Sequence, residues 1–256
     1  MSDTKLVSTI KLLENRFPDL DSKELYARIM CGEVLVNGET VRTPARLIPS
    51  DASVTFKRKK YVSRGGQKLE AALETWNISV KGKVVLDAGC STGGFTDCLL
   101  KRGVSFVHAV DVGYNQVDYR IRTNPAVALY ERRNIMDIHS LDPPPHGAVA
   151  DLSFRSIAGV GSHILSLTTE GWLISLVKPQ FEWRNPSPDF RGVVRDSHEV
   201  EQILCSVVDR LWDEKAYVVR MMRSPLRGRK GNIEFLFFIT KEKNGSAEDI
   251  KKNIRT

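Results

Sequence analysis

The sequence predicts an α/β fold in which a doubly wound, seven-stranded, mostly parallel sheet follows a small α+β domain. From residue 83 onward, short apolar runs alternate with segments of helical spacing, as expected when helices cover both faces of a parallel sheet. The first of these runs, 84–86, leads directly into a glycine-rich turn. A separate hairpin signal, Asn37-Gly38, lies within the first 60 residues and indicates an independent small domain.

The composition is that of a folded, basic protein. The 256 residues are 27% charged and 41% hydrophobic, the net charge is +7 and the pI is about 9.2. This charge favours a polyanionic partner. The cysteines are widely spaced, no secretory signal is evident at the start and no apolar run is long enough to span a bilayer. We therefore expect reduced thiols, no metal site, no stable membrane association and a cytoplasmic protein.

The small domain is expected to occupy residues 1–60. Helical spacing predicts helices over 4–17 and 23–31, and short strands are expected on both sides of the Asn37-Gly38 turn and over 54–56. Residues 61–68 contain two adjacent glycines, which suggest a hinged linker to the next domain.

The large domain is expected over 69–241. Its predicted strands cover 84–87, 106–111, 127–131, 148–151, 172–177, 217–222 and 233–240. A strongly amphipathic helix is predicted over 199–214, and the last two strands form a hairpin-like pair that would place one antiparallel strand at the end of the sheet. Residues 242–256 are charged and poor in apolar side chains, so they are expected to form a frayed tail.

The glycine-rich turn after the first large-domain strand points to a nucleotide-like ligand. It lacks both the Gly-x-Gly-x-x-Gly of dinucleotide sites and the Gly-Lys-Ser/Thr of phosphate loops. Asp87-x-Gly89 after one strand and Asp111 at the end of the next resemble instead the cofactor site of Rossmann-like, S-adenosylmethionine-dependent methyltransferases. The alternative is an ordinary glycine-rich turn of an α/β domain.

The sequence also limits the methyl acceptor. Amino-group methylation commonly uses Asn/Asp-Pro-Pro-aromatic after the fourth strand, where this chain has Asp151-Leu152-Ser153-Phe154. Cytosine C5 methylation needs a nucleophilic cysteine in that loop, and none is present. A hydroxyl acceptor therefore remains, and it needs a group that takes up its proton.

Four polar residues lie at or near strand ends on one side of the predicted sheet: Lys68, Asp151, Lys178 and Glu234. Glu234 interrupts a hydrophobic strand and Lys178 ends a buried run, and buried charges need partners. A lysine desolvated beside a second ammonium group gives up its proton more readily and can act as a base. The alternative is two unrelated salt bridges.

Residues 22–56 resemble the small RNA-binding domain of the fourth protein of the ribosomal small subunit. The resemblance rests on Ala27-Arg28-Ile29-x-x-Gly32-x-Val34-x-Val36-Asn37-Gly38. It implies contacts with structured RNA, mostly to phosphates. The basic residues that could make them are Lys23, Arg28, Arg42, Arg46, Lys57, Arg58, Lys59, Lys60 and Arg64. The alternative is a domain with a solvated basic surface and no RNA affinity.

Residues 22–240 resemble the hemolysin A (TlyA) family of ribosomal RNA 2′-O-methyltransferases. The motifs that carry the resemblance are Ser63-Arg64-Gly65-Gly66-x-Lys68-Leu69, Ser91-Thr92-Gly93-Gly94-Phe95-Thr96-Asp97, Asp111-Val112-Gly113, Val177-Lys178-Pro179-Gln180-Phe181-Glu182, Gly192-Val193-Val194-Arg195-Asp196 and Gly231-Asn232-x-Glu234-Phe235-Leu236. The resemblance implies an FtsJ-type methyltransferase domain that methylates a cytidine ribose of ribosomal RNA, either free or in ribosomal subunits.

The same resemblance implies roles for individual residues. Lys68, Asp151, Lys178 and Glu234 fall on a Lys-Asp-Lys-Glu catalytic tetrad in which Lys178 is the base, the two acids orient it, and Lys68 sets its basicity and holds the substrate. S-adenosyl-L-methionine would be bound by Asp87, Gly89, Ser91, Thr92, Gly93, Gly94, Asp111 and Asn134. Two other functions stay open: an RNA-binding, ribosome-associated protein without turnover, and a hemolysin acting on membranes. The second is disfavoured because neither an export signal nor a lipid-facing segment is evident.

Overall fold

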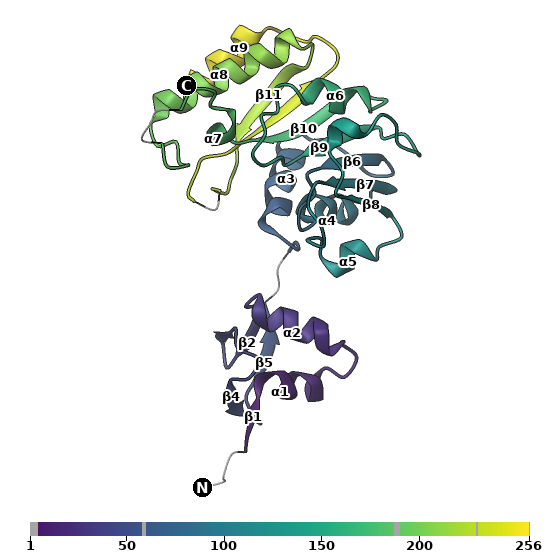
Figure 1. Cartoon of the computed structure of the whole chain (residues 1–256), viewed down its shortest axis with the longest axis vertical. Coiled ribbons are helices and arrows are strands. Elements are labelled where there is room, and N and C mark those ends of the chain that lie inside the picture. Colours follow the sequence, from purple (N-terminus) through teal and green to yellow (C-terminus); the bar gives the residue numbers. More distant parts are fainter. Residues whose placement is uncertain (1–4, 58–59, 187–189, 229, 256) are drawn as a thin grey trace. The chain divides into compact units, whose positions relative to one another are not determined.

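The protein forms two compact units, Met1–Lys59 and Lys60–Thr256 (Figure 1). The structure is a computed structural model that describes residues 5–57, 60–186, 190–228 and 230–255. Each unit has its own hydrophobic core.

The first unit packs two helices against short strands. Its elements are β1 (Leu6–Ser8), α1 (Thr9–Arg16), α2 (Ser22–Met30), β2 (Val34–Val36), β3 (Glu39–Val41), β4 (Leu47–Pro49) and β5 (Val54–Phe56). β2 pairs with β3 and with β5, and β1 pairs with β4. The hairpin predicted at Asn37-Gly38 is confirmed: both residues have positive φ, 49° and 85°, as a tight two-residue turn between twisted strands requires.

The prediction of one helix over 4–17 was wrong in its first part. Leu6 to Ser8 form a strand antiparallel to β4, and the helix begins only at Thr9. The partner strand lies some 40 positions away, and Thr9 donates both its backbone N–H and its hydroxyl to the Arg46 carbonyl. Local helical spacing carries no information about such a partner.

The second unit contains a seven-stranded sheet with the order β11-β12-β10-β9-β6-β7-β8. Its strands are β6 (Val84–Ala88), β7 (Phe106–Asp111), β8 (Val127–Glu131), β9 (Gly147–Ala150), β10 (Trp172–Val177), β11 (Tyr217–Arg223) and β12 (Phe235–Thr240). All neighbours are parallel except β12, which is antiparallel to both β10 and β11. The predicted sheet and its antiparallel strand are confirmed, although β12 begins after Glu234 rather than at 233.

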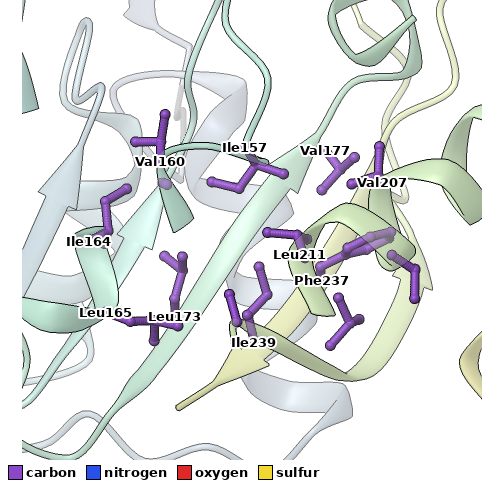
Figure 2. Close-up of a cluster of buried hydrophobic side chains, with 14 of the residues drawn as sticks. Ile157, Val160, Ile164, Leu165, Leu173, Val177, Val207, Leu211, Phe237 and Ile239 are labelled. Atoms are coloured by element: carbon purple, nitrogen blue, oxygen red, sulfur yellow. The ribbon is translucent and has the colours of Figure 1, made fainter. Parts of the chain in front are cut away.

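Helices cover both faces of this sheet (Figure 1). They are α3 (Arg64–Thr75), α4 (Gly94–Lys101), α5 (Tyr119–Arg122), η1 (Ile135–Asp137), α6 (Gly161–Ser166), α7 (Pro179–Glu182), α8 (Ser197–Asp213) and α9 (Ala247–Arg255). Figure 2 shows one of the cores, where Val207 and Leu211 of α8 meet Phe237 and Ile239 of β12. This burial fixes the strand register, and the register fixes which residues reach the sheet edge. Among the described residues, no helix combines the length and apolar character needed to cross a membrane.

The predicted hinge over 61–68 is largely helical. Ser63 caps α3 by accepting a hydrogen bond from the Gly65 N–H (3.3 Å), so both glycines lie in the first helical turn. A Cβ on Gly66 would lie only 2.3 Å from the Tyr61 ring. Glycine is therefore needed here for close packing rather than for flexibility.

The predicted frayed tail contains an ordered helix, α9. Ile250 is buried against the core to which α8 contributes, and Lys251 forms ion pairs with Asp209 (2.8 Å) and Glu248 (2.5 Å). The composition of this segment predicted no packed helix because it is mostly polar. The helix packs through a narrow apolar stripe that includes Ile250 and Ile254.

Candidate active site

The predicted site residues gather at one edge of the large sheet. The parallel strands β6, β7, β9 and β10 end there, and the antiparallel strand β12 begins there. Open α/β sheets place their ligands at this edge because loops and helix starts converge on it. Two adjoining sets of residues occupy the edge, which we call the cofactor half (Asp87, Gly89–Gly94, Asp111–Gly113 and Asn134) and the tetrad half (Lys68, Asp151, Lys178 and Glu234).

The glycines of the cofactor half pack mainly against protein. A Cβ on Gly89 would lie 2.9 Å from the Asp151 carbonyl oxygen, one on Gly93 3.1 Å from Ile121, and one on Gly94 2.1 Å from the Ser63 hydroxyl. Gly89 and Gly93 also have φ of 82° and 90°, which disfavour other residues. Close packing and turn geometry are therefore the direct reason for glycine at these positions.

Asp111 organises the exposed surface of the cofactor half. Its carboxylate accepts hydrogen bonds from the backbone N–H groups of Ser91 (2.8 Å) and Gly113 (2.6 Å), which fastens the glycine turn to the end of β7. Ser91 and Thr92 are exposed, and so is the apolar side chain of Val112, with 70% of its surface accessible. Sequence reasoning missed Val112; an apolar residue directly after a strand-end acid was the available signal.

Asn134 lies after β8 on the same edge, where its side chain caps η1. Its Oδ1 accepts a hydrogen bond from the Met136 N–H (3.1 Å), and the residue remains partly exposed. The cap fixes the orientation of the side-chain amide.

Asp87 lies beneath the turn rather than on its surface. It is fully buried, its Oδ2 accepts a hydrogen bond from the Thr96 hydroxyl (2.6 Å), and its Oδ1 has no hydrogen-bond partner among the described residues. Burial raises the pKa of Asp87 to about 7, and the charges of Asp151 and Asp111 add to this effect. A direct cofactor contact of Asp87 stays a prediction, and its Oδ1 is the acceptor that such a contact would use.

These features fit a cationic adenosyl ligand. Three carboxylates, those of Asp87, Asp111 and Asp151, are close enough to repel one another, and such a cluster favours a positively charged group nearby. The partnerless Oδ1 of Asp87 and the exposed Val112 add an unused acceptor and an apolar surface. S-adenosyl-L-methionine, which combines a sulfonium, an ammonium and an adenosine, matches this set of groups.

The tetrad half consists of two ion pairs. Lys178 Nζ lies 2.6 Å from Asp151 Oδ1, and Lys68 is paired with Glu234. The strand register brings the pairs together, because Val177 of β10 lies opposite Phe235 of β12, so Lys178 and Glu234 both extend from this strand pair at the same edge. Lys68 lies in the second turn of α3, and Asp151 directly follows β9.

The tetrad is mostly shielded from water. Less than a tenth of Lys68, Lys178 and Glu234 is accessible, whereas 27% of the Asp151 side chain is exposed. Ligand access to the tetrad is therefore from the Asp151 side. Both ion pairs lie at the same end of the β10–β12 strand pair, as a shared site requires.

The loop after β9 supplies groups that sequence reasoning missed. Lys178 Nζ donates hydrogen bonds to the Leu152 carbonyl (3.0 Å) and the Ser153 hydroxyl (3.2 Å), in addition to its ion pair with Asp151. Phe154 is 90% exposed, has a positive φ of 61°, and lies 4.9 Å from the Phe181 ring between centroids. Phe154 thus combines an exposed aromatic ring with a strained backbone, next to the buried charges of the tetrad. Such a ring is suited to stacking on a planar ligand.

The predicted RNA-binding residues are dispersed and differ in availability. In the first unit, Lys23, Arg42, Arg46 and Lys57 are exposed, whereas Arg28 is half-buried. Arg28 pairs with Glu24 and packs over the Phe56 ring at 4.7 Å. Lys60 and Arg64 belong to the second unit, where Lys60 pairs with Glu70 and Arg64 is exposed. Arg58 and Lys59 lie outside the described residues.

The fold and the cofactor half together define an S-adenosylmethionine-dependent methyltransferase of the Rossmann-like class. Residues 61–241 match the family model of the FtsJ-like methyltransferases.

Individual relatives agree with this class. The chain is 40% identical to hemolysin A of Brachyspira hyodysenteriae, over 81% of this chain and 89% of that protein. It is 36% identical to the 16S/23S rRNA (cytidine-2′-O)-methyltransferase TlyA of Mycobacterium tuberculosis, over 82% and 81% of the two chains. A solved structure from Streptococcus thermophilus, described as a candidate hemolysin, superposes with a TM-score of 0.72 at 31% identity and covers 98% of this chain and 96% of its own. The chain therefore belongs to the FtsJ-like methyltransferase family, in the group that contains hemolysin A and TlyA.

Proposed function

We propose that this protein transfers a methyl group from S-adenosyl-L-methionine to the 2′-hydroxyl of a ribose in ribosomal RNA, cytidine being the nucleoside named for its M. tuberculosis relative. The observation that carries the proposal is the pair of shielded ion pairs, Lys178–Asp151 and Lys68–Glu234, at the sheet edge beside the cofactor half. A methyltransferase acting on an already nucleophilic nitrogen has no need of buried lysines there, whereas a hydroxyl acceptor needs a base.

The cofactor half holds and orients the methyl donor. Asp111 would accept hydrogen bonds from the ribose hydroxyls of the adenosine, and Val112 and Asn134 would contact its adenine. Ser91 and Thr92, with the backbone of Gly89, Gly93 and Gly94, would hold the methionine part. Asp87 contributes negative charge from beneath the turn. When bound, S-adenosyl-L-methionine supplies a methyl group on a sulfonium, which leaves as a neutral thioether.

The tetrad half prepares the acceptor. Lys178 takes up the proton of the 2′-hydroxyl as its oxygen forms the new bond to carbon. Asp151 and Glu234 hold the two lysines in place, and the exposed face of Phe154 stacks on a base of the substrate.

Ribosomal RNA also fits the rest of the chain. The net charge of +7 suits a polyanion, and exposed basic residues of the first unit, among them Lys23, Arg42 and Lys57, are suited to phosphate contacts. Such a substrate places the protein in the cytoplasm.

The test is transfer of tritium from methyl-labelled S-adenosyl-L-methionine to ribosomal subunits isolated from cells that lack this protein. We expect label in RNA, at a single linkage that resists alkaline cleavage because its 2′-hydroxyl is blocked. Label in protein, or in RNA that stays alkali-sensitive at every labelled position, would contradict the proposal.

A further inference from the structure

A basic loop borders the tetrad and takes no part in the mechanism above. It joins β11 to β12 and projects beyond the ends of these strands (Figure 1). Residues 224–233 of this loop contain three cations, Arg227, Arg229 and Lys230, and no acid. The run ends at Glu234 of the tetrad.

The loop is attached to the tetrad by direct contacts. A Cβ on Gly228 would lie 2.5 Å from Glu234 Oε1, so the loop backbone packs against this carboxylate. Arg64, one helical turn before Lys68 on α3, donates a hydrogen bond to the Arg227 carbonyl. Arg227 in turn donates to the Gly231 carbonyl (3.2 Å). The loop is thus held to the two elements that supply Lys68 and Glu234.

Three cations of this region, Arg64, Arg227 and Lys230, form what we call the basic rim. All three are exposed, and within the described residues none is paired with a carboxylate. Several cations elsewhere in the second unit are paired, for example Lys83 with Glu170 (2.5 Å), Arg122 with Glu131 (2.7 Å) and Lys251 with Asp209 (2.8 Å). The three rim cations, in contrast, present positive charge without a carboxylate partner beside the tetrad.

We infer that the basic rim binds backbone phosphates of the substrate RNA next to the methylated nucleotide. The inference rests on the proposed function and adds a substrate-binding surface that belongs to the methyltransferase unit itself. Arg64 and Arg227 each donate one hydrogen bond to a backbone carbonyl and keep further N–H groups for a ligand. A guanidinium group matches phosphate oxygens in charge and geometry. A polynucleotide whose ribose reaches Lys178 carries phosphates on both sides, and the rim is attached to the neighbouring ion pair.

The test compares two double variants that each remove two positive charges. Arg227→Ala with Lys230→Ala changes the rim. Lys81→Ala with Lys243→Ala is the control, since both residues are exposed and lie at the opposite edge, before β6 and after β12. Methyl transfer to ribosomal subunits is measured at several potassium chloride concentrations with magnesium fixed, and cofactor affinity is measured by calorimetry.

We expect the rim variant to show a kcat/KM about tenfold or more below wild type at low salt, through KM, with cofactor affinity and kcat at saturating RNA unchanged. The slope of log kcat/KM against log salt should become shallower by roughly 0.7 to 0.9 for each phosphate that the variant no longer neutralises. Arg227→Lys with Lys230→Arg should restore most of the activity, and the control should keep the wild-type slope. A rim variant with the same slope as the control would overturn the inference.

This outcome is separable from failure of the proposed function. If the wild-type protein methylates no subunit, the same variants are tested by filter binding of radiolabelled ribosomal RNA over the same salt series. A shallower binding slope in the rim variant alone supports the rim without turnover, and equal slopes for the rim and control variants reject it.

Discussion

The two halves of the catalytic edge are built in different ways. The cofactor half comes mainly from two consecutive strand–loop segments, with its turn fastened by backbone N–H groups to the Asp111 carboxylate. The tetrad half comes from long side chains of four separate segments, and its partners Lys68 and Glu234 are 166 positions apart. The cofactor surface needs only the pairing of two neighbouring strands. The tetrad side chains come together only after the strands that carry them have paired in the correct register. We therefore expect changes in the tetrad half to affect chemistry and folding together, and changes at the exposed residues of the cofactor half to affect chiefly cofactor binding.

The largest effect is expected from Lys178→Ala. Removing the base should lower the single-turnover rate of methyl transfer about 10²- to 10⁴-fold, while the dissociation constant of S-adenosyl-L-methionine changes less than about twofold. Rapid-quench measurement of labelled RNA gives the rate, and calorimetry gives the affinity. Lys83→Ala, which removes an ion-paired lysine outside both halves, is the control and should keep wild-type rates.

Glu234→Ala should be the most destabilising change in the tetrad half. It leaves the Lys68 ammonium buried without its partner, at an expected cost of about 3 to 5 kcal/mol in the free energy of unfolding. Urea titration followed by tryptophan fluorescence measures this. Combining it with Lys68→Met should recover much of the stability, because the unpaired charge is then gone; a double variant as unstable as Glu234→Ala would show that the ion pair is not the cause.

Asp87→Asn should change how stability depends on pH. Because the folded state raises the pKa of Asp87 from about 4 to about 7, it binds a proton more tightly than the unfolded chain does. The contribution of this residue is fully present below about pH 4 and is lost as pH rises to about 7, by at most about 4 kcal/mol. The wild-type melting temperature should therefore fall relative to that of Asp87→Asn between pH 5 and pH 8. A difference between the two proteins that stays constant over this range would refute the assignment.

A smaller effect is expected from Asp111→Asn. The variant keeps one acceptor oxygen for the loop but loses the negative charge, so cofactor affinity should weaken about tenfold, equivalent to about 1.4 kcal/mol. The methyl-transfer rate at saturating cofactor should stay near the wild-type value. Asp213→Asn is a matched control outside the cofactor half, since Asp213 is exposed at the end of α8, and it should leave the affinity unchanged.

The sequence predicted correctly those elements that depend on local turn residues or on periodic apolar spacing. Three strands, 106–111, 127–131 and 172–177, match the structure at both ends, and the sheet with its antiparallel strand was confirmed. Two of the errors share one physical cause, a partner distant in sequence: the strand at Leu6 needs β4, and the helix around Ile250 needs the core beside α8. The hinge prediction failed for a local reason, because Gly66 accommodates the ring of Tyr61, five positions earlier.

In the candidate site, too, the features set by local sequence could be predicted and those set by distant contacts could not. Asp111 and the glycine turn could be located from strand ends, and the four tetrad residues from charges placed where apolar residues were expected. The acceptors around Lys178 and the exposed Phe154 were not foreseen, because the conformation of the loop after β9 depends on its packing against α7.

The division of labour between the two halves can be tested by one measurement: the single-turnover methyl-transfer rate as a function of S-adenosyl-L-methionine concentration, for wild type, Lys178→Ala and Asp111→Asn at saturating RNA. We expect Lys178→Ala to lower the plateau rate and to leave the half-saturation concentration unchanged. Asp111→Asn should raise the half-saturation concentration and leave the plateau unchanged. If either variant moved both quantities by similar factors, the cofactor half and the tetrad half would not be separate functional units, and the account would be wrong.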